Sequence, residues 1–301
     1  MCCLVVLSIS VPAFAANIAW VSFHSDPSDG PSAAATSFGF TAAPDKGYTD
    51  LLRSAGHTVT RYLTTEDDPN VSSLASYDLV ILSRSVNSGH YEEDAETAAW
   101  NGLTVPLISM GGYPLRNNRM GFYSGTTIPD TAAPIKLTVN DPSNPIFAGI
   151  TLDGSNTMVN DYAGIATLPH APNTVQRGIS VVTNPVVAGG TVLATAPVGD
   201  PATAAPIIAF FPTGTSLATS PVDTLGGPRL VFLSGSREAS NQMFPGQPSN
   251  TSSETAGIYD LSADGAQMFL NAVELMAAIP EPSTAMLLVF AVAGLGMLRK
   301  R

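Results

Sequence analysis

The chain has 301 residues and an acidic composition, with 24 Asp and Glu residues against 13 Lys and Arg residues and a formal net charge of −11 at pH 7. Proteins that bind nucleic acid need clustered Lys and Arg to neutralise phosphates, so this composition argues against a nucleic-acid partner. The two cysteines are Cys2 and Cys3. If the N-terminal segment is removed, the mature protein has no disulfide, no cysteine nucleophile and no cysteine-bound metal.

The N-terminal segment, residues 1–15, is apolar and has the character of a signal peptide. It ends in Ala13-Phe14-Ala15, the A-x-A pattern of a signal-peptide cleavage site. The positively charged start that is usual in such segments is missing, since no Lys or Arg precedes Lys46. We expect cleavage after Ala15 and export of the protein. The alternative is that these residues form a buried first strand.

The first half of the remaining chain alternates between segments typical of strands and segments typical of helices. The strand segments are rich in apolar and β-branched residues, and the helical segments carry apolar residues at spacings of three and four. The expected strands are residues 16–23, 57–63, 77–86 and 105–110, and the expected helices are residues 45–55 and 91–100. Continuous apolar strands separated by helices predict a parallel sheet covered on both faces.

The second half is richer in strand signals and closes on one strong helix. Strands are expected at residues 134–139, 190–196, 206–211 and 229–235. Ser262 is the expected N-cap of the final helix, whose apolar face is formed by Met268, Phe269, Ala272, Val273 and Met276. The sequence therefore predicts one α/β domain over residues 16–278.

The last segment, residues 279–301, has three parts. Its residues are Pro280, Glu281 and Pro282, then an apolar run without charge at 285–298, then Arg299, Lys300 and Arg301. As a helix the apolar run would be about 21 Å long, which is short for a bilayer core of about 30 Å. The basic cluster should stay on the cytoplasmic side. We expect a C-terminal transmembrane helix here, and the alternative is a buried helix of the domain.

This three-part pattern resembles the PEP-CTERM protein-sorting signal of Gram-negative bacteria. The resemblance implies recognition by an exosortase, a membrane transpeptidase-like enzyme, and removal of the tail. It also implies membrane contact through the apolar helix before processing, and an association with exopolysaccharide or biofilm. The expected location is the cell envelope or the extracellular space, with a transient or stable anchor in the inner membrane.

The body of the chain resembles the class I glutamine amidotransferase-like fold and its relatives near the ThuA family. The segments that carry the resemblance are IAWVSF, LLRSAGHTVT, YDLVILSRSV, VPLISMGGY, NPIFAGI, RLVFLSGSRE and LSADGAQMFLNAVELM. The resemblance covers most of residues 16–278 and lies in the order of strands and turns. It implies an α/β flavodoxin-like three-layer sandwich, with a mostly parallel central sheet and β-rich additions in the second half.

The catalytic pair of the amidotransferase relatives is missing from this sequence. Those relatives place a nucleophilic cysteine after the VPLIS-like strand, where this chain has Met110, and methionine cannot become a nucleophile. Their general-base histidine follows a later strand, where residues 234–238 contain no histidine. Glutaminase activity is therefore not expected.

Other candidate residues lie at the predicted carboxyl ends of strands, where open α/β sheets bind their ligands. His24 is the one histidine expected at such an end, because His57, His90 and His170 fall elsewhere. Ser83, Ser85, Ser109 and Arg237 follow other strands of the predicted sheet. A catalytic site, if the chain has one, would use His24 with Ser83 or Ser85 and Arg237. No G-x-S-x-G motif supports it.

Metal and anion binding are the two other chemical possibilities at these loops. Asp26 and Asp29 lie in a short glycine-containing loop with His24, a composition that suits calcium, although Asp and Gly also favour plain turns. No cofactor is expected. Arginines near loop ends would suit an acidic ligand, and salt bridges explain them almost as well. They are Arg84, Arg116, Arg119 and Arg237.

Three functions remain open at this point. The favoured one is a non-catalytic protein of the cell envelope or extracellular matrix that binds a glycan or another matrix component. The alternative is an extracellular hydrolase that acts on a carbohydrate or an ester in the strand-end cleft. A purely structural matrix component, without a specific ligand, is the third.

Overall fold

The computed structural model describes residues 15–279 except 38, 69, 93, 132–133, 165–166, 169–170, 176–177, 200–201, 220 and 237–255. The predictions for Ala13, His170, Arg237 and the whole tail from Pro280 to Arg301 therefore fall outside the described residues. Within the described ranges, no helix combines the length and the apolar character that crossing a membrane requires.

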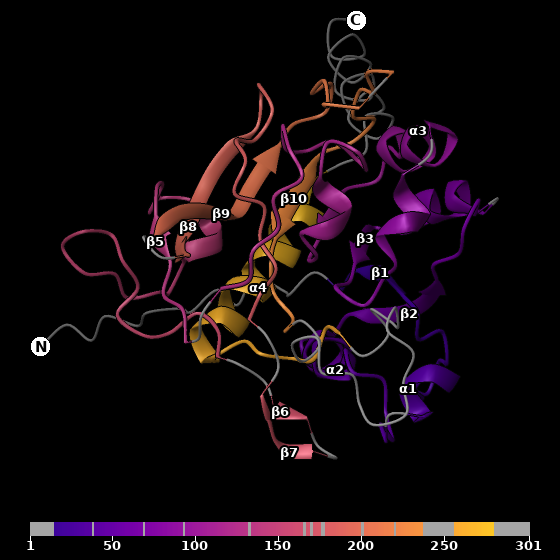
Figure 1. Cartoon of the computed structure of the whole chain (residues 1–301), viewed down its shortest axis with the longest axis horizontal. Coiled ribbons are helices and arrows are strands. Elements are labelled where there is room, and N and C mark those ends of the chain that lie inside the picture. Colours follow the sequence, from indigo (N-terminus) through magenta and orange to yellow (C-terminus); the bar gives the residue numbers. More distant parts are fainter. Residues whose placement is uncertain are drawn as a thin grey trace, which may run out of the picture.

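An eight-stranded mixed sheet forms the centre of the α/β fold (Figure 1). Its order is β2-β1-β3-β4-β10-β9-β8-β5. The first five strands run parallel, and they are β1 (Asn17–Ser22), β2 (Thr58–Leu63), β3 (Leu79–Leu82), β4 (Leu107–Ser109) and β10 (Arg229–Phe232). Their order matches the 2-1-3-4-5 order of flavodoxin-type doubly wound sheets.

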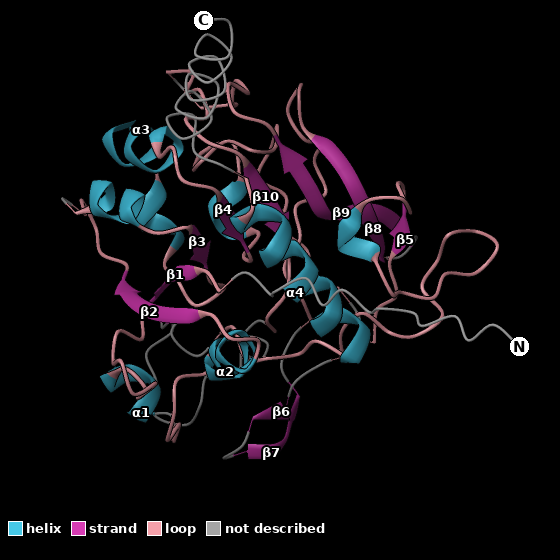
Figure 2. Ribbon diagram, turned by 180° about the vertical axis from the view of Figure 1, so that it is seen from behind, coloured by secondary structure: helices cyan, strands magenta, loops and turns pink. Residues whose placement is uncertain are grey.

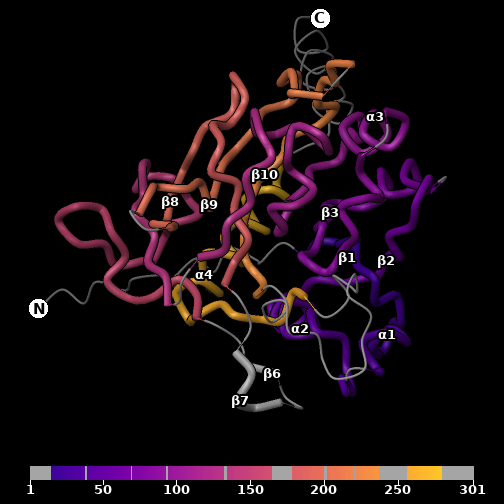
Figure 3. The backbone as a smooth tube through the Cα atoms, in the orientation of Figure 1, coloured from indigo at the N-terminus to yellow at the C-terminus, as the bar shows by residue number. Residues whose placement is uncertain are grey.

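The β-rich addition of the second half extends the same sheet by three antiparallel strands. They are β5 (Thr138–Val139), β8 (Thr191–Val198) and β9 (Thr203–Phe211). A separate two-stranded sheet pairs β6 (Thr167–Leu168) with β7 (Ala171–Val175). Figure 3 shows how the late strand β10 returns to lie beside the early strands in the middle of the sheet.

The strands form where the sequence allows burial on both faces. All residues of β3, β4 and β10 are buried, as the continuous apolar runs predict. The edge strand β2 is only partly buried, and its last residue, Leu63, is 44% exposed. The predicted strand at residues 134–139 is reduced to the two residues of β5.

The helices are α1 (Ala33–Ser37), α2 (Lys46–Ser54), α3 (Asp94–Gly102) and α4 (Ala263–Ala277). The described residues also form the 3₁₀ helices η1 (Val71–Ser76), η2 (Ser88–Tyr91), η3 (Tyr113–Leu115) and η4 (Pro145–Phe147). Helices α2 and α4 lie on one face of the sheet (Figure 2), where the rings of Tyr48 and Phe269 are 5.7 Å apart. The predicted N-cap of α4 is confirmed, because Ser262 Oγ accepts a hydrogen bond from Gly265 N at 3.1 Å.

Helix α3 ends on a buried cation. Arg229, at the start of β10, donates to the carbonyl oxygens of Trp100, Asn101 and Leu103 in the last turn of α3 and just beyond it. It also donates to Val105 O and Pro228 O. A positive charge at this place compensates both the unpaired carbonyl groups and the negative end of the helix dipole. Burial lowers the pKa of Arg229 to about 9.

Candidate functional site

The carboxyl ends of the parallel strands carry a set of buried polar side chains. His24 follows β1, Ser83 and Ser85 follow β3, Ser109 ends β4, and Ser234 and Ser236 follow β10. All of these side chains are buried, with His24 only 1% exposed. These polar side chains at the strand ends thus lie in the interior of the protein.

His24 and Ser85 are brought together as a pair. His24 Nε2 lies 3.0 Å from Ser85 Oγ, and the ring is fixed from its other side by Ser32 N, which donates to His24 Nδ1 at 3.1 Å. A ring nitrogen that accepts from an amide carries no proton, so in the neutral imidazole Nε2 carries it. His24 therefore donates to Ser85. A general base for a serine nucleophile has the opposite arrangement, because its Nε2 must accept the hydroxyl proton.

The neighbouring serines have different roles. Ser83 Oγ accepts a hydrogen bond from Ser85 N at 3.1 Å and so tightens the turn after β3. Ser109 Oγ is buried and has no hydrogen-bond partner among the described residues. It directly precedes Met110.

The loop after β1 is held by ion pairs around Arg61. Arg61 Nε donates to Asp29 Oδ1 at 2.5 Å, and Arg61 Nη1 donates to Asp45 Oδ1 at 3.0 Å and to His24 O at 3.1 Å. Arg53 also pairs with Asp29. Burial acts to raise the pKa of Asp29, but the two guanidinium groups outweigh it and hold the pKa below its usual value.

These contacts give the two candidate metal ligands other partners. Both oxygens of Asp29 are bound by arginines, which a cation would have to displace. Asp26 accepts from the amide and the hydroxyl of Ser28, at 2.8 and 2.6 Å, in a local turn of the kind that Asp favours. Across the described part of the chain, no group of three or more His, Cys, Asp or Glu side chains gathers in a way that could hold a metal ion.

The remaining described histidines lie apart from His24 and Ser85. His57 directly precedes β2 and so lies at the amino end of that strand, away from the carboxyl ends. Its Nδ1 accepts a hydrogen bond from Ala16 N at 3.2 Å. His90 lies in η2, 2.9 Å from Thr64 Oγ1, and burial lowers its pKa. Both side chains support the fold locally.

A buried carboxyl group that the sequence did not point to lies beside the end of β10. Asp260 Oδ1 accepts from Tyr48 OH at 2.8 Å and from Gly235 N at 3.0 Å, and Oδ2 accepts from Ser236 Oγ at 3.1 Å. Burial raises the pKa of Asp260 to about 6. In the sequence Asp260 looks like an ordinary loop acid before the N-cap of α4, so no local signal marks it.

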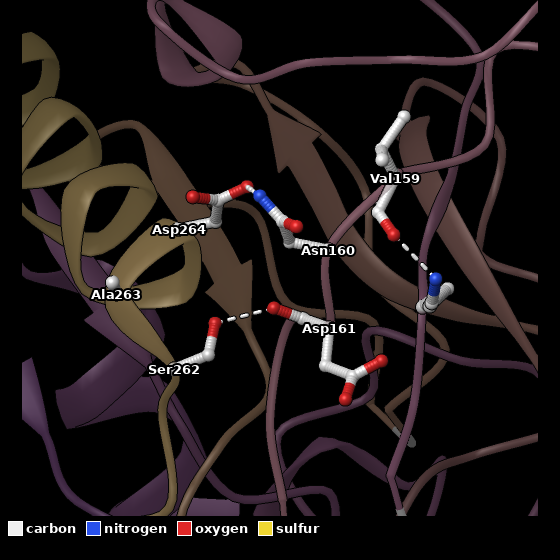
Figure 4. Close-up of a pocket in the computed structure, with 7 residues that line it drawn as sticks. Val159, Asn160, Asp161, Ser262, Ala263 and Asp264 are labelled. Carbon is white, nitrogen blue, oxygen red and sulfur yellow. Dashed lines mark hydrogen bonds between the residues drawn. The ribbon is translucent and has the colours of Figure 1, made fainter.

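A shallow polar pocket of about 400 Å³ lies at the start of α4 (Figure 4). It is lined by Lys136, Val159, Asn160, Asp161, Ser262, Ala263 and Asp264. Asn160 Nδ2 donates to Asp264 Oδ2 at 3.1 Å, and Lys136 donates to Val159 O. The Asp161 carboxylate has no hydrogen bond to the other residues drawn in Figure 4. Carboxylates, an amide and an amine in one open pocket can exchange hydrogen bonds with a ligand's hydroxyl groups.

Comparison with known proteins gives similarity in structure alone. No family model matches the chain, and no curated protein matches it. Among solved structures, a cytoplasmic protein from Salmonella typhimurium has 12% identity and a TM-score of 0.46, with 86% of this chain and 98% of that chain covered.

Two other similar structures are described as ThuA-like proteins. The one from Bacteroides uniformis has 10% identity and a TM-score of 0.44, with 92% of this chain and 96% of that chain covered. The one from Parabacteroides merdae has 11% identity and a TM-score of 0.46, with 88% and 91% covered. At such TM-scores the similarity says nothing about activity.

Proposed function

We propose that this protein is an exported component of the cell envelope or extracellular matrix that binds a glycan or another matrix component and catalyses no reaction. In this proposal the body is a flavodoxin-like, amidotransferase-related domain without the amidotransferase nucleophile. The tail with Pro280, Glu281 and Pro282 acts as a PEP-CTERM sorting signal that an exosortase reads. Its apolar run, residues 285–298, serves as a transmembrane helix until the tail is processed.

The observation that carries the non-catalytic part of the proposal is the orientation of His24. Its Nδ1 accepts from Ser32 N, which places the proton on Nε2, and Nε2 faces Ser85 Oγ. His24 therefore cannot act as the base for Ser85 in this arrangement, and both side chains are buried. The polar pocket at the start of α4 supports the binding part, because its groups suit the hydroxyls of a saccharide.

The hydrolase alternative rests on one specific observation, the distance of 3.0 Å between His24 Nε2 and Ser85 Oγ. If the loop that carries Ser32 moved away, the imidazole could change tautomer and accept the Ser85 proton. The substrate would then be a carbohydrate or an ester at the carboxyl ends of the strands.

A fluorophosphonate probe separates the two functions, because it labels activated serines only. We expect no labelling of the purified protein under conditions that label a known serine hydrolase. Labelling of the wild type that disappears in Ser85→Ala would establish the hydrolase and end the non-catalytic proposal. Binding is tested in parallel by co-sedimentation with exopolysaccharide from the producing cells, with Asp161→Asn as the pocket variant.

The proposed location needs a separate measurement. We would determine the intact mass of the native protein from envelope and medium fractions. Loss of mass at both ends, near Ala15 and near Pro280 to Pro282, is the expected result. A full-length tail in the membrane fraction would instead mean a C-terminally anchored protein, and the exosortase part of the proposal would be withdrawn.

A further inference from the structure

Three arginines gather at the carboxyl ends of two neighbouring strands. Arg84 follows β3, and Arg116 and Arg119 follow β4, which pairs with β3. The guanidinium carbons of Arg84 and Arg116 lie 5.2 and 5.3 Å from the centre of the Tyr113 ring. This is the edge at which open α/β sheets bind ligands. In a protein with a net charge of −11, three arginines at one place are unexpected.

Arg116 is held in place by two neutral groups. Its Nε donates to Tyr113 O at 2.9 Å, and Nη2 donates to Ser88 Oγ at 3.2 Å. Among the described residues it has no carboxylate partner. Burial, followed by the nearby charge of Arg119, lowers the pKa of Arg116. Burying a charge without a partner costs free energy, so partly buried charges are normally paired. A bound anion would reduce this cost for Arg116.

Arg119 and Arg84 complete the cluster in different ways. Arg119 forms an ion pair with Glu92, whose side chain is 42% exposed. The stem of Arg84 is packed closely, since a Cβ atom at Gly235 would be 3.0 Å from Arg84 Cβ and one at Gly111 would be 3.3 Å from Arg84 Cδ. A side chain fixed in this way loses little freedom when a ligand binds.

The donors of the cluster favour one class of anion. Phosphate sites in α/β folds use backbone amides at a helix start, but the short helix after β4 begins with Tyr113 and Pro114, and proline has no N–H to offer. The donors that remain are planar guanidinium groups, which match the two oxygens of a carboxylate.

We propose that Arg84, Arg116 and Arg119 around Tyr113 form a binding site for a carboxylate-bearing ligand, such as the uronate of an acidic saccharide. This inference goes beyond the proposed function, because anion binding by the purified protein requires neither export nor a particular matrix. Either proposal can therefore fail without the other.

Isothermal titration calorimetry of the full chain tests the site, with glucuronate as the probe, glucose as the neutral sugar and inorganic phosphate as the second anion. Glucuronate should bind more tightly than glucose and phosphate, and its affinity should fall as salt screens the charges. Arg116→Met should weaken glucuronate binding at least about tenfold. Arg116→Lys keeps the positive charge but lacks the planar pair of N–H donors of a guanidinium group. It should therefore recover only part of the affinity.

Lys46→Met is the matched control, because it removes one positive charge from an exposed pair with Asp50. It should leave glucuronate binding unchanged. Arg119→Met gives a second test if Arg116→Met does not fold, as judged by circular dichroism. The proposal is overturned if glucuronate does not bind, if glucose or phosphate binds as tightly, or if Lys46→Met weakens binding as much as the arginine substitutions do.

Discussion

Replacing Asp260 with Asn should change how the stability of this protein depends on pH. The carboxyl group is buried, and its pKa rises from 3.8 to about 6 because burial disfavours the charged form. At about 1.4 kcal/mol for each tenfold change in proton affinity, this rise corresponds to about 3 kcal/mol. A raised carboxyl pKa means that the folded state holds the proton more tightly than the unfolded state. The associated stability is therefore fully present below about pH 4 and is lost as the pH rises through about 6.

An asparagine can keep all three hydrogen bonds of Asp260 without the charge. Its Oδ1 can still accept from Tyr48 OH and Gly235 N, and its Nδ2 can donate to Ser236 Oγ. The two proteins should therefore be about equally stable near pH 4. Near pH 7.5, Asp260→Asn should be more stable than the wild type by about 3 kcal/mol.

Urea unfolding at several values between about pH 4 and pH 7.5 measures this difference. The difference between variant and wild type isolates Asp260, because all other groups titrate in both proteins. Asp161→Asn is the control for the loss of one negative charge, since that residue is only partly buried. A difference for Asp260→Asn that stays constant with pH, or that grows toward acid, would refute the reasoning.

Three further predictions concern buried charges and one turn. Arg61→Met should cost about 3–5 kcal/mol in urea unfolding, because the buried Asp45 loses its ion-pair partner and Asp29 keeps only Arg53. Arg53→Met, with a side chain 33% exposed, should cost about 1 kcal/mol or less, and equal losses would contradict this. Arg229→Met should cost about 2–3 kcal/mol because the carbonyls that end α3 lose their donors, and an unchanged melting temperature would argue against that role. Gly235→Ala should destabilise more than Gly149→Ala by about 1 kcal/mol or more, since both have φ near +83° but only Gly235 would meet a neighbouring side chain. Equal melting temperatures of these two alanine variants would contradict the contact argument.

The parallel strands could be predicted because each of them buries both faces. A strand such as β3, whose four residues are all buried, needs an apolar residue at every position and is visible without knowledge of its neighbours. The strand expected at residues 134–139 is longer than the observed strand β5, which has two residues. Ile135 is buried and apolar, but it bridges to Ala163 outside the main sheet, and a single sequence does not reveal which partner a strand will find.

The polar contacts of the site were not predictable in the same way. Tyr48 and Asp260 are 212 positions apart in the sequence, and only the packing of α2 beside the end of β10 brings them together. Asp29 had the local signature of a turn or a metal ligand, because its partners Arg53 and Arg61 come from a helix and a strand further along the chain. The sequence suggests that His24 and Ser85 could lie close together, but it gives no sign that Ser32 fixes the imidazole ring.

Catalysis and recognition make different demands on the same edge of the sheet. A serine nucleophile must be accessible, and its base must be free to accept a proton. At the pair of His24 and Ser85 both side chains are buried, and the ring is committed to donating. An anion site needs fixed positive charge that is not already neutralised. Arg116 meets this demand within the described residues, because a hydroxyl and a carbonyl hold it while no carboxylate does. The chemistry of this edge therefore favours binding over bond cleavage.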